Sequence, residues 1–131
     1  MFLDASAMVA ILVGEDDAAA LTKRLEQAAE AYTSPIAVYE AVLGIARACR
    51  VPIPAAEAIL DRFLEQAAIR IMPITAEIGR GAVAAFERYG RGRHRAALNL
   101  GDCFAYACAR SLDLPLLFKG DDFPHTDIAV A

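Results

Sequence analysis

The chain has 131 residues, of which 57% are hydrophobic and 23% charged, and its formal net charge is −4. These values exclude a disordered chain and a uniformly basic nucleic-acid-binding surface, so any contact with nucleic acid must come from a local basic patch. No run of about 18 apolar residues occurs, which excludes a membrane-spanning helix, and the length suits a single domain, residues 1–131.

The first residues of the chain predict a short buried strand that ends in a carboxylate. The apolar run Met1–Leu3 stops abruptly at Asp4, and small residues follow it into a helix expected at 5–13. Ligands of parallel sheets bind outside the carboxyl ends of the strands, so Asp4 lies where chemistry is expected. No basic residue precedes the apolar run and Asp4 interrupts it, so we expect no signal peptide.

The next segments predict a second helix at 16–29, a short strand at 31–33 and a third helix at 35–50. Ser34 and Pro35 form a strong helix start, because Ser is a favoured N-cap and Pro suits the first helical position. The third helix is apolar on nearly all sides, which is typical of a buried helix. Glu40 lies in the middle of it.

The second half of the chain continues the alternation of helices and strands. We expect a helix at 55–67, a strand at 69–74, a helix from Thr75 to about residue 89, a helix at 102–112, and strands at 114–118 and 126–130. The inner side of the 75–89 helix is expected to hold Ile78, Ala82, Ala85, Phe86 and Tyr89. Such alternation predicts βαβ units, with helices on both faces of a parallel sheet.

The three cysteines, Cys49, Cys103 and Cys108, show no metal-ligand spacing and lie in apolar helical segments. We interpret them as buried thiols of a protein from a reducing, cytoplasmic compartment.

Several acidic residues are expected at one edge of the sheet. Asp4 ends the first strand, Glu40 follows the second, Asp102 begins a helix, and Asp121 and Asp122 follow the strand at 114–118. Two unit charges about 5 Å apart repel by roughly 3 kcal/mol at an effective dielectric of 20, so such a cluster must protonate or bind cations. Oxygen ligands suit Mg²⁺ or Mn²⁺, and that chemistry cleaves phosphodiesters.

Each acidic residue also has a purely structural interpretation. Asp4 and Asp102 are both suited to capping helices, Asp121 and Asp122 are ordinary turn residues, and Glu40 can pair with a basic residue. The basic side chains leave similar alternatives. They are candidates for phosphate contacts, or else for a solvated loop or a strand end: Arg91, Arg93, His94, Arg95 and Lys119.

The order of these segments resembles a PIN-domain ribonuclease, specifically the VapC-type toxins of bacterial toxin–antitoxin pairs. The resemblance covers essentially the whole chain. The segments that carry it are residues 1–7, 34–40, 89–106, 116–123 and 126–128, and the long segment from Tyr89 to Tyr106 is the most specific.

The resemblance implies a three-layer α/β/α sandwich around a mostly parallel five-stranded sheet. It implies an Mg²⁺- or Mn²⁺-dependent endoribonuclease, a homodimer, and inhibition by a cognate VapB-type antitoxin. The acids of the family map onto Asp4, Glu40 and Asp102, with Asp4 and Asp102 as direct metal ligands and Glu40 either binding the metal through a water molecule or helping to activate that water. Asp121 and Asp122 compete for the place of the fourth acid.

Two other functional classes were weighed against a nuclease. A receiver-like phosphoacceptor also places an aspartate and Mg²⁺ at a strand end, and Lys119 can stand for its lysine. That class needs a phosphoacceptor aspartate after the central strand, which Ile74 and Thr75 do not supply, and it leaves Glu40 unexplained. The third class is a non-catalytic interaction domain whose acids only cap helices.

Overall fold

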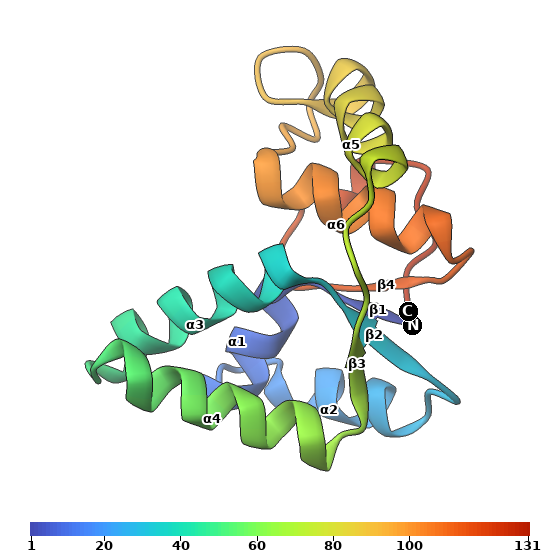
Figure 1. The fold of residues 1–131 in the computed structure, drawn as a ribbon. Helices are drawn as coiled ribbons and strands as arrows, with labels where there is room; N and C mark the ends of the chain where they lie inside the picture. Colours follow the sequence, from blue (N-terminus) through green and yellow to red (C-terminus); the bar gives the residue numbers. More distant parts are fainter.

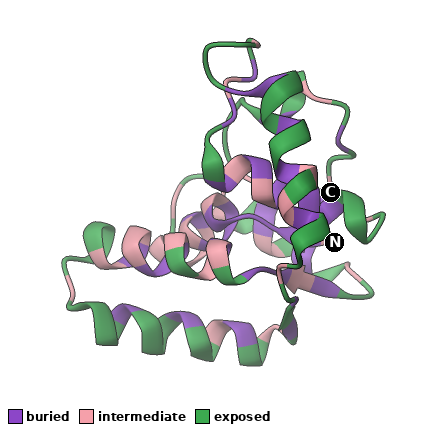
Figure 2. Ribbon diagram, turned by 45° about the horizontal axis from the view of Figure 1, so that its top comes forward, coloured by how far each residue is buried: buried purple, intermediate pink, exposed green.

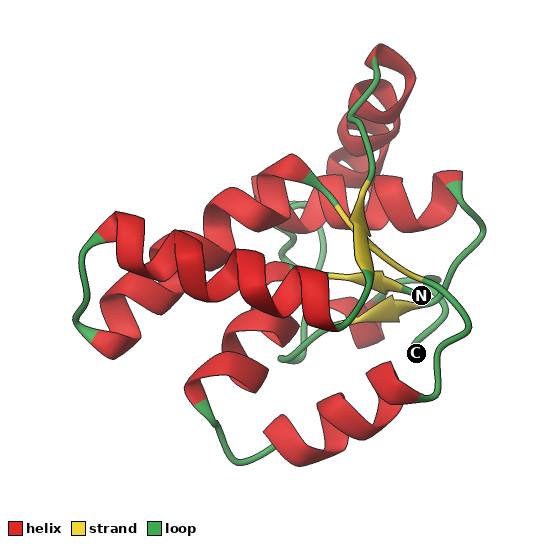
Figure 3. Ribbon diagram, turned by 60° about the horizontal axis from the view of Figure 1, so that its bottom comes forward, coloured by secondary structure: helices red, strands yellow, loops and turns green.

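The computed structural model describes all residues, 1–131, and consists of a small parallel sheet between two groups of helices (Figures 1 and 3). The strands are β1 (Phe2–Leu3), β2 (Ala31–Thr33), β3 (Ile69–Ile71) and β4 (Leu116–Leu117), in the spatial order β3-β2-β1-β4. The helices are α1 (Ala5–Val13), α2 (Ala18–Glu26), α3 (Pro35–Cys49), α4 (Ile53–Gln66), α5 (Ala76–Tyr89), α6 (Leu100–Ser111) and the 3₁₀ helix η1 (Phe123–His125). None of the helices combines the length and the hydropathy that crossing a membrane requires.

Alternating side chains of the adjacent strands β1 and β4 divide the core into two layers. Phe2 and Leu116 pack with α5 and α6 on one face of the sheet. Leu3 and Leu117 pack with α1, α3 and α4 on the other. This follows from the two-residue period of a strand, and all four side chains are fully buried. The buried centre and the exposed outer sides of the helices are visible in Figure 2. The three-layer α/β/α arrangement predicted from the sequence is confirmed.

The expected fifth strand at 126–130 is wrong in its extent. Only Val130 forms a bridge, parallel to Leu116, while the residues before it leave the sheet. The reason is that Asp127 accepts a hydrogen bond of 2.5 Å from the Tyr106 hydroxyl and lies 3.6 Å from the Arg88 guanidinium. These contacts hold the segment against α5 and α6, so the sheet has four strands.

Phe86 and Cys49, which the sequence predicts to be buried, lie outside in the structure, as does Ile59 on α4, predicted to face inward. Phe86 is 44% exposed, because α5 packs on the core through Ile78, Ala82 and Ala85 and turns Phe86 away from it. Cys49 is exposed because it belongs to the last turn of α3, beyond the buried part of that helix. Cys103 and Cys108 are buried, as expected.

Helices α1 and α3 pack closely at a glycine, and this contact positions the segments that carry Asp4 and Glu40. A Cβ added to Gly44 on α3 would lie 2.8 Å from a methyl group of Val9 on α1, whereas a Cβ added to Gly79 on α5 meets nothing within 4 Å. The two glycines can therefore be compared directly by mutation. Both lie in helices, but only Gly44 lies at a close contact between two helices.

We expect Gly79→Ala to raise the free energy of unfolding by about 0.5–1 kcal/mol, because alanine is the better helix former. Gly44→Ala should lower it by about 1 kcal/mol, because overpacking costs about 1–3 kcal/mol and outweighs the same gain. Urea unfolding curves of the two variants measure the difference. Equal stabilisation of both variants would contradict the tight packing of α1 on α3.

Candidate functional site

Asp4 is held at the end of β1 by the helix that follows it. The residue is buried, with 7% of its surface exposed, and it is the N-cap of α1. Its Oδ2 accepts hydrogen bonds from the Ser6 backbone N–H at 2.9 Å and from the Ser6 hydroxyl at 2.5 Å. The Ser6 hydroxyl in turn accepts the Lys119 backbone N–H at 3.0 Å, which ties the end of β1 to the chain after β4. Asp4 therefore caps a helix and also faces the site.

Burial raises the pKa of the Asp4 carboxyl, although the hydrogen bonds from Ser6 oppose this shift. The charged form is therefore disfavoured unless a cation lies close by.

Glu40 reaches the same region from the second turn of α3. Its carboxylate lies against Gly101, where a Cβ would overlap it, so a side chain at this point in α6 would displace Glu40. Burial raises the pKa of Glu40 to about 7, and the charges of Asp4 and Asp102 add to the shift. None of the ion pairs in the chain involves Glu40, so the structural pairing that the sequence left open is not found.

Asp102 is the third residue of α6 and forms a capping box with Asn99. The Asn99 side chain accepts the Asp102 backbone N–H at 2.9 Å, and Asp102 Oδ2 accepts the Asn99 backbone N–H at 2.9 Å. Asn99, and not Asp102, is thus the N-cap of this helix. Burial raises the pKa of Asp102 to about 6, helped by the charges of Asp4 and Asp122 and opposed by the Asn99 bond and the charge of Arg91.

The three carboxylates line one open cavity of about 480 Å³. They come from segments far apart in the chain, at the carboxyl end of β1, on α3 and at the start of α6. Polar side chains complete much of the wall: Ser6, Glu15, Asn99 and Lys119. The acids are not drawn into a tight cluster of three that would hold a metal ion by itself.

The donor chemistry of this cavity fits a hard divalent cation. Its ligating atoms are carboxylate, amide and hydroxyl oxygens, whereas the nearby Cys103 faces a different, apolar cavity. Mg²⁺ keeps several of its own waters and needs only one or two protein carboxylates, so widely spaced acids suit it. Burial, followed by the charges of neighbouring acids, raises the pKa values of Glu40 and Asp102, and such a cation would oppose both effects.

The two candidates for the fourth acid are placed differently. Both Asp121 and Asp122 are exposed, and neither lines the cavity. Asp122 precedes η1 and its charge raises the pKa of Asp102, whereas Asp121 has no such effect. Of the two residues, Asp122 is therefore the one whose charge acts on a carboxylate of the site.

The basic loop of residues 90–95 lies beside the start of α6. Arg91 is near enough to Asp102 to lower its pKa, and the backbone N–H of Arg91 donates to the Leu98 carbonyl. Arg93 and Arg95 are exposed, and Arg93 Nε donates to the Glu87 carbonyl.

His94 has a structural setting within this loop. Its Nδ1 accepts the Ala96 backbone N–H at 3.1 Å, and its ring packs edge-on against Tyr89.

Lys119 lines the cavity, but its charge is already paired. The ammonium group forms ion pairs with Glu15 and, at 3.3 Å, with Asp17, both from the turn between α1 and α2. In the sequence, Glu15 and Asp17 are acidic residues close to the start of a helix, where negative charge is favourable. The sequence gives no sign that Lys119 pairs with Glu15, which lies 104 residues away. The role of Asn99 can be read from the sequence, because the Asn-x-x-Asp spacing is typical of a capping box.

Known proteins resemble this chain in sequence and in fold. The family model described as PIN domain matches residues 1–129. The VapC ribonuclease Mb0640 of Mycobacterium bovis is 44% identical, over 98% of this chain and 96% of the relative. The ribonuclease VapC of Mycolicibacterium smegmatis is 40% identical, over 98% of both chains.

Among solved structures, Mycobacterium tuberculosis VapC20, titled a Sarcin-Ricin loop cleaving toxin, matches with a TM-score of 0.80. The alignment covers 99% of this chain and 97% of that one, and its 16% identity supports a shared fold. The chain therefore belongs to the PIN domain family and, within it, to the VapC proteins.

Proposed function

We propose that the protein is a metal-dependent endoribonuclease that acts as the toxin of a toxin–antitoxin pair. The observation that carries the proposal is the meeting of Asp4, Glu40 and Asp102 in one cavity at the carboxyl end of β1. The names of the relatives support RNA as the substrate, since they are ribonucleases, and VapC20 is described as cleaving an RNA loop. A receiver-like or purely structural role gains no support from these relatives.

Asp4 and Asp102 are the proposed direct ligands of Mg²⁺ or Mn²⁺. Each has one carboxylate oxygen, Oδ2, engaged by the backbone at the start of its own helix, which fixes the side chain and leaves Oδ1 for the cation. A bound divalent cation supplies Lewis-acid stabilisation of the charge that develops on the phosphodiester.

Glu40 is the proposed proton acceptor for the attacking water. Its pKa of about 7 places it near neutral pH, where a general base is most effective. The cation would oppose this rise in pKa, because opposite charge favours the carboxylate form, which is the form that accepts a proton. Asp122 is the proposed fourth acid, on the strength of its effect on Asp102.

The RNA backbone is proposed to lie along the basic loop. Arg91 is the member closest to the carboxylates, and the exposed side chains of Arg93 and Arg95 extend the positive surface away from the cavity. Phosphate contacts of this kind position a nucleic acid without reading its sequence. Because Lys119 is paired with Glu15 and Asp17, it contributes less to this surface than its place in the cavity suggests.

Two separate apolar surfaces are proposed for two protein partners. One lies between α5 and α6, where Val83 is 71% and Leu100 67% exposed around an almost wholly apolar cavity of about 340 Å³. Its apolar character suits a second copy of the chain, because obligate homodimer interfaces are the more hydrophobic class.

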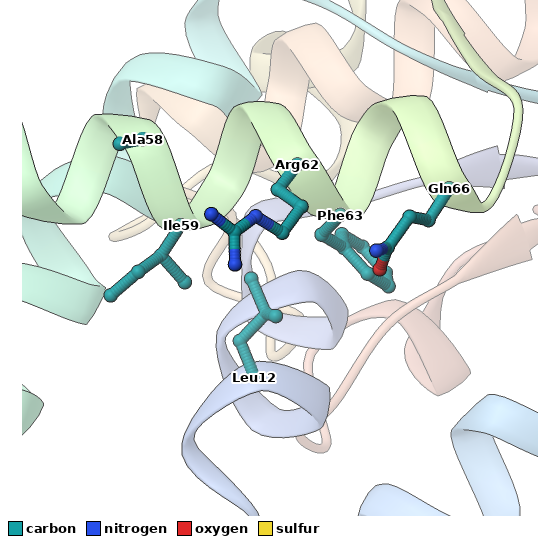
Figure 4. A pocket seen from close by; sticks show the side chains of 6 residues that line it. All are labelled: Leu12, Ala58, Ile59, Arg62, Phe63 and Gln66. Atoms are coloured by element: carbon teal, nitrogen blue, oxygen red, sulfur yellow. The ribbon is translucent and has the colours of Figure 1, made fainter.

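The other surface lies between α1 and α4, where side chains of α4 point toward Leu12 on α1 (Figure 4). This cavity of about 260 Å³ mixes Ile59 and Phe63 with Arg62 and Gln66. Apolar anchors with a polar rim suit an amphipathic helix, which we assign to the VapB-type antitoxin. The cytoplasm is the proposed compartment, because the RNA substrate is found there and free thiols such as those of Cys103 and Cys108 stay reduced there.

The first test replaces the proposed metal ligands. We expect Asp4→Asn and Asp102→Asn each to reduce RNA cleavage by more than about 100-fold, because even indirect partners of metal ligands contribute about 10–100-fold. Asp61→Asn, an exposed acid on α4, is the control and should cleave at the normal rate. Circular dichroism verifies the fold of each variant. Normal cleavage by Asp102→Asn would refute the proposed active site.

The second test uses the melting temperature of metal-free protein. The folded-state pKa values of Glu40 and Asp102 lie above their ordinary values, so the folded state binds the extra protons as the pH falls. The melting temperature should therefore rise between pH 8 and pH 5. Mn²⁺ or Mg²⁺ should raise it at pH 8 and flatten the dependence, with a gain of about 2.7 kcal/mol at 100 times the dissociation constant. Glu40→Gln should weaken the pH dependence, and an unchanged slope would argue against the shared cavity.

The third test separates the two partner surfaces by co-expression with a cognate VapB-type antitoxin. Val83→Glu should convert a dimer into a monomer that still retains the antitoxin, because a charge in an apolar interface is costly. Ile59→Glu should give the reverse, a dimer without the antitoxin. Size-exclusion chromatography with light scattering measures both. If neither variant changes the assembly, the assignment of the surfaces is wrong.

A further inference from the structure

Asn99 lines the cavity beside the carboxylates and is hydrogen-bonded to Asp102, but it has no role in the proposed reaction. It lies on the wall of the carboxylate cavity, immediately before α6, and its side-chain oxygen accepts the Asp102 backbone N–H. In return, Asp102 Oδ2 accepts the Asn99 backbone N–H, so the two residues hold each other through two bonds of 2.9 Å. The Asp102 carboxylate is therefore fastened by one oxygen only.

The chain before Asn99 is fixed by the core, which makes this cap a rigid support. Leu98 is fully buried, and its backbone N–H donates to the Tyr89 carbonyl at 2.9 Å. Its carbonyl accepts the Arg91 N–H at 3.0 Å, which closes the basic loop on itself. Asn99 therefore follows a residue that is held in place. Its own backbone is extended, with φ −85° and ψ −174°, and its N–H points at Asp102.

We propose that Asn99 is a positioning residue for Asp102, holding one carboxylate oxygen at the start of α6 so that the other faces the cation. This inference rests on the proposed function of Asp102 as a metal ligand. Without the cap, repulsion from the Asp4 and Glu40 carboxylates favours rotation of Asp102 away from the cavity. The Asn99 side chain acts through backbone geometry, because it stabilises the extended N-cap conformation from which the N–H reaches Asp102.

The proposal makes the hydrogen-bonding cap, and not the amide group itself, the functional feature. Serine is as good an N-cap as asparagine, whereas alanine is a poor one. Asn99→Ser therefore keeps the cap and removes the amide, and Asn99→Ala removes both. The chain also offers a matched control, because Thr75 caps α5 by accepting the Ile78 N–H, and α5 carries none of the carboxylates.

The experiment measures Mn²⁺ affinity by titration calorimetry, with RNA cleavage as a second readout, at a temperature where every variant is folded. Asn99→Ala should bind Mn²⁺ about 10-fold more weakly, the lower end of the effect of losing an outer partner of a metal ligand. Asn99→Ser should bind within twofold of the unchanged protein. Thr75→Ala should lose melting temperature much as Asn99→Ala does, and yet bind Mn²⁺ normally.

The outcomes separate this inference from the proposed function. Normal Mn²⁺ affinity in Asn99→Ala, together with weak affinity in Asp102→Asn, overturns the role of Asn99 and leaves the metal site standing. Equal losses in Asn99→Ser and Asn99→Ala also overturn it, since the amide and not the cap would then matter. Normal affinity in Asp102→Asn removes the proposed metal site, and the inference falls with it.

Discussion

The burial of three carboxylates in one cavity is the constraint on which the rest of this structure depends. Asp4, Glu40 and Asp102 each have a raised pKa, and burial is the largest cause for all three. Two of them reduce the cost by capping contacts, since Asp4 accepts from the first turn of α1 and Asp102 from the residue that begins α6. Helix N-termini favour negative charge, so backbone N–H groups of the fold stabilise these two carboxylates without a bound cation.

The sheet makes this arrangement possible because parallel strands deliver their following residues to one edge. β1 places Asp4 there, β2 leads through Ser34 into α3 and Glu40, and β4 leads to Lys119, whose backbone N–H closes on Ser6. Helix α6 brings Asp102 from the opposite layer, and Gly101 lets it approach Glu40 closely. The strands are only two or three residues long. Even so, β1 joins both core layers, because Phe2 packs in one layer and Leu3 in the other.

Local signals in the sequence were sufficient for the frame of the site and insufficient for its long-range contacts. The strand ending at Asp4 and the Ser34 cap were predictable, since each depends on a few adjacent residues. The segment at 126–130 had the composition of a strand, but Asp127 is drawn to Tyr106 and Arg88, which no local pattern reveals. The exposure of Phe86 likewise depends on the rotation of α5 against its neighbours. Such features are decided by tertiary packing, which overrides local propensity.

The charge of the cavity also bears on how an anionic substrate can enter it. Four acids line the wall, Asp4, Glu15, Glu40 and Asp102, against the single cation of Lys119. Because Glu15 and Asp17 pair with that lysine, the cavity as folded repels a phosphodiester. A divalent cation would relieve the internal repulsion and make the cavity less repulsive to an anion. The stability of the fold and the affinity for an anionic substrate would thereby both depend on the proposed ion.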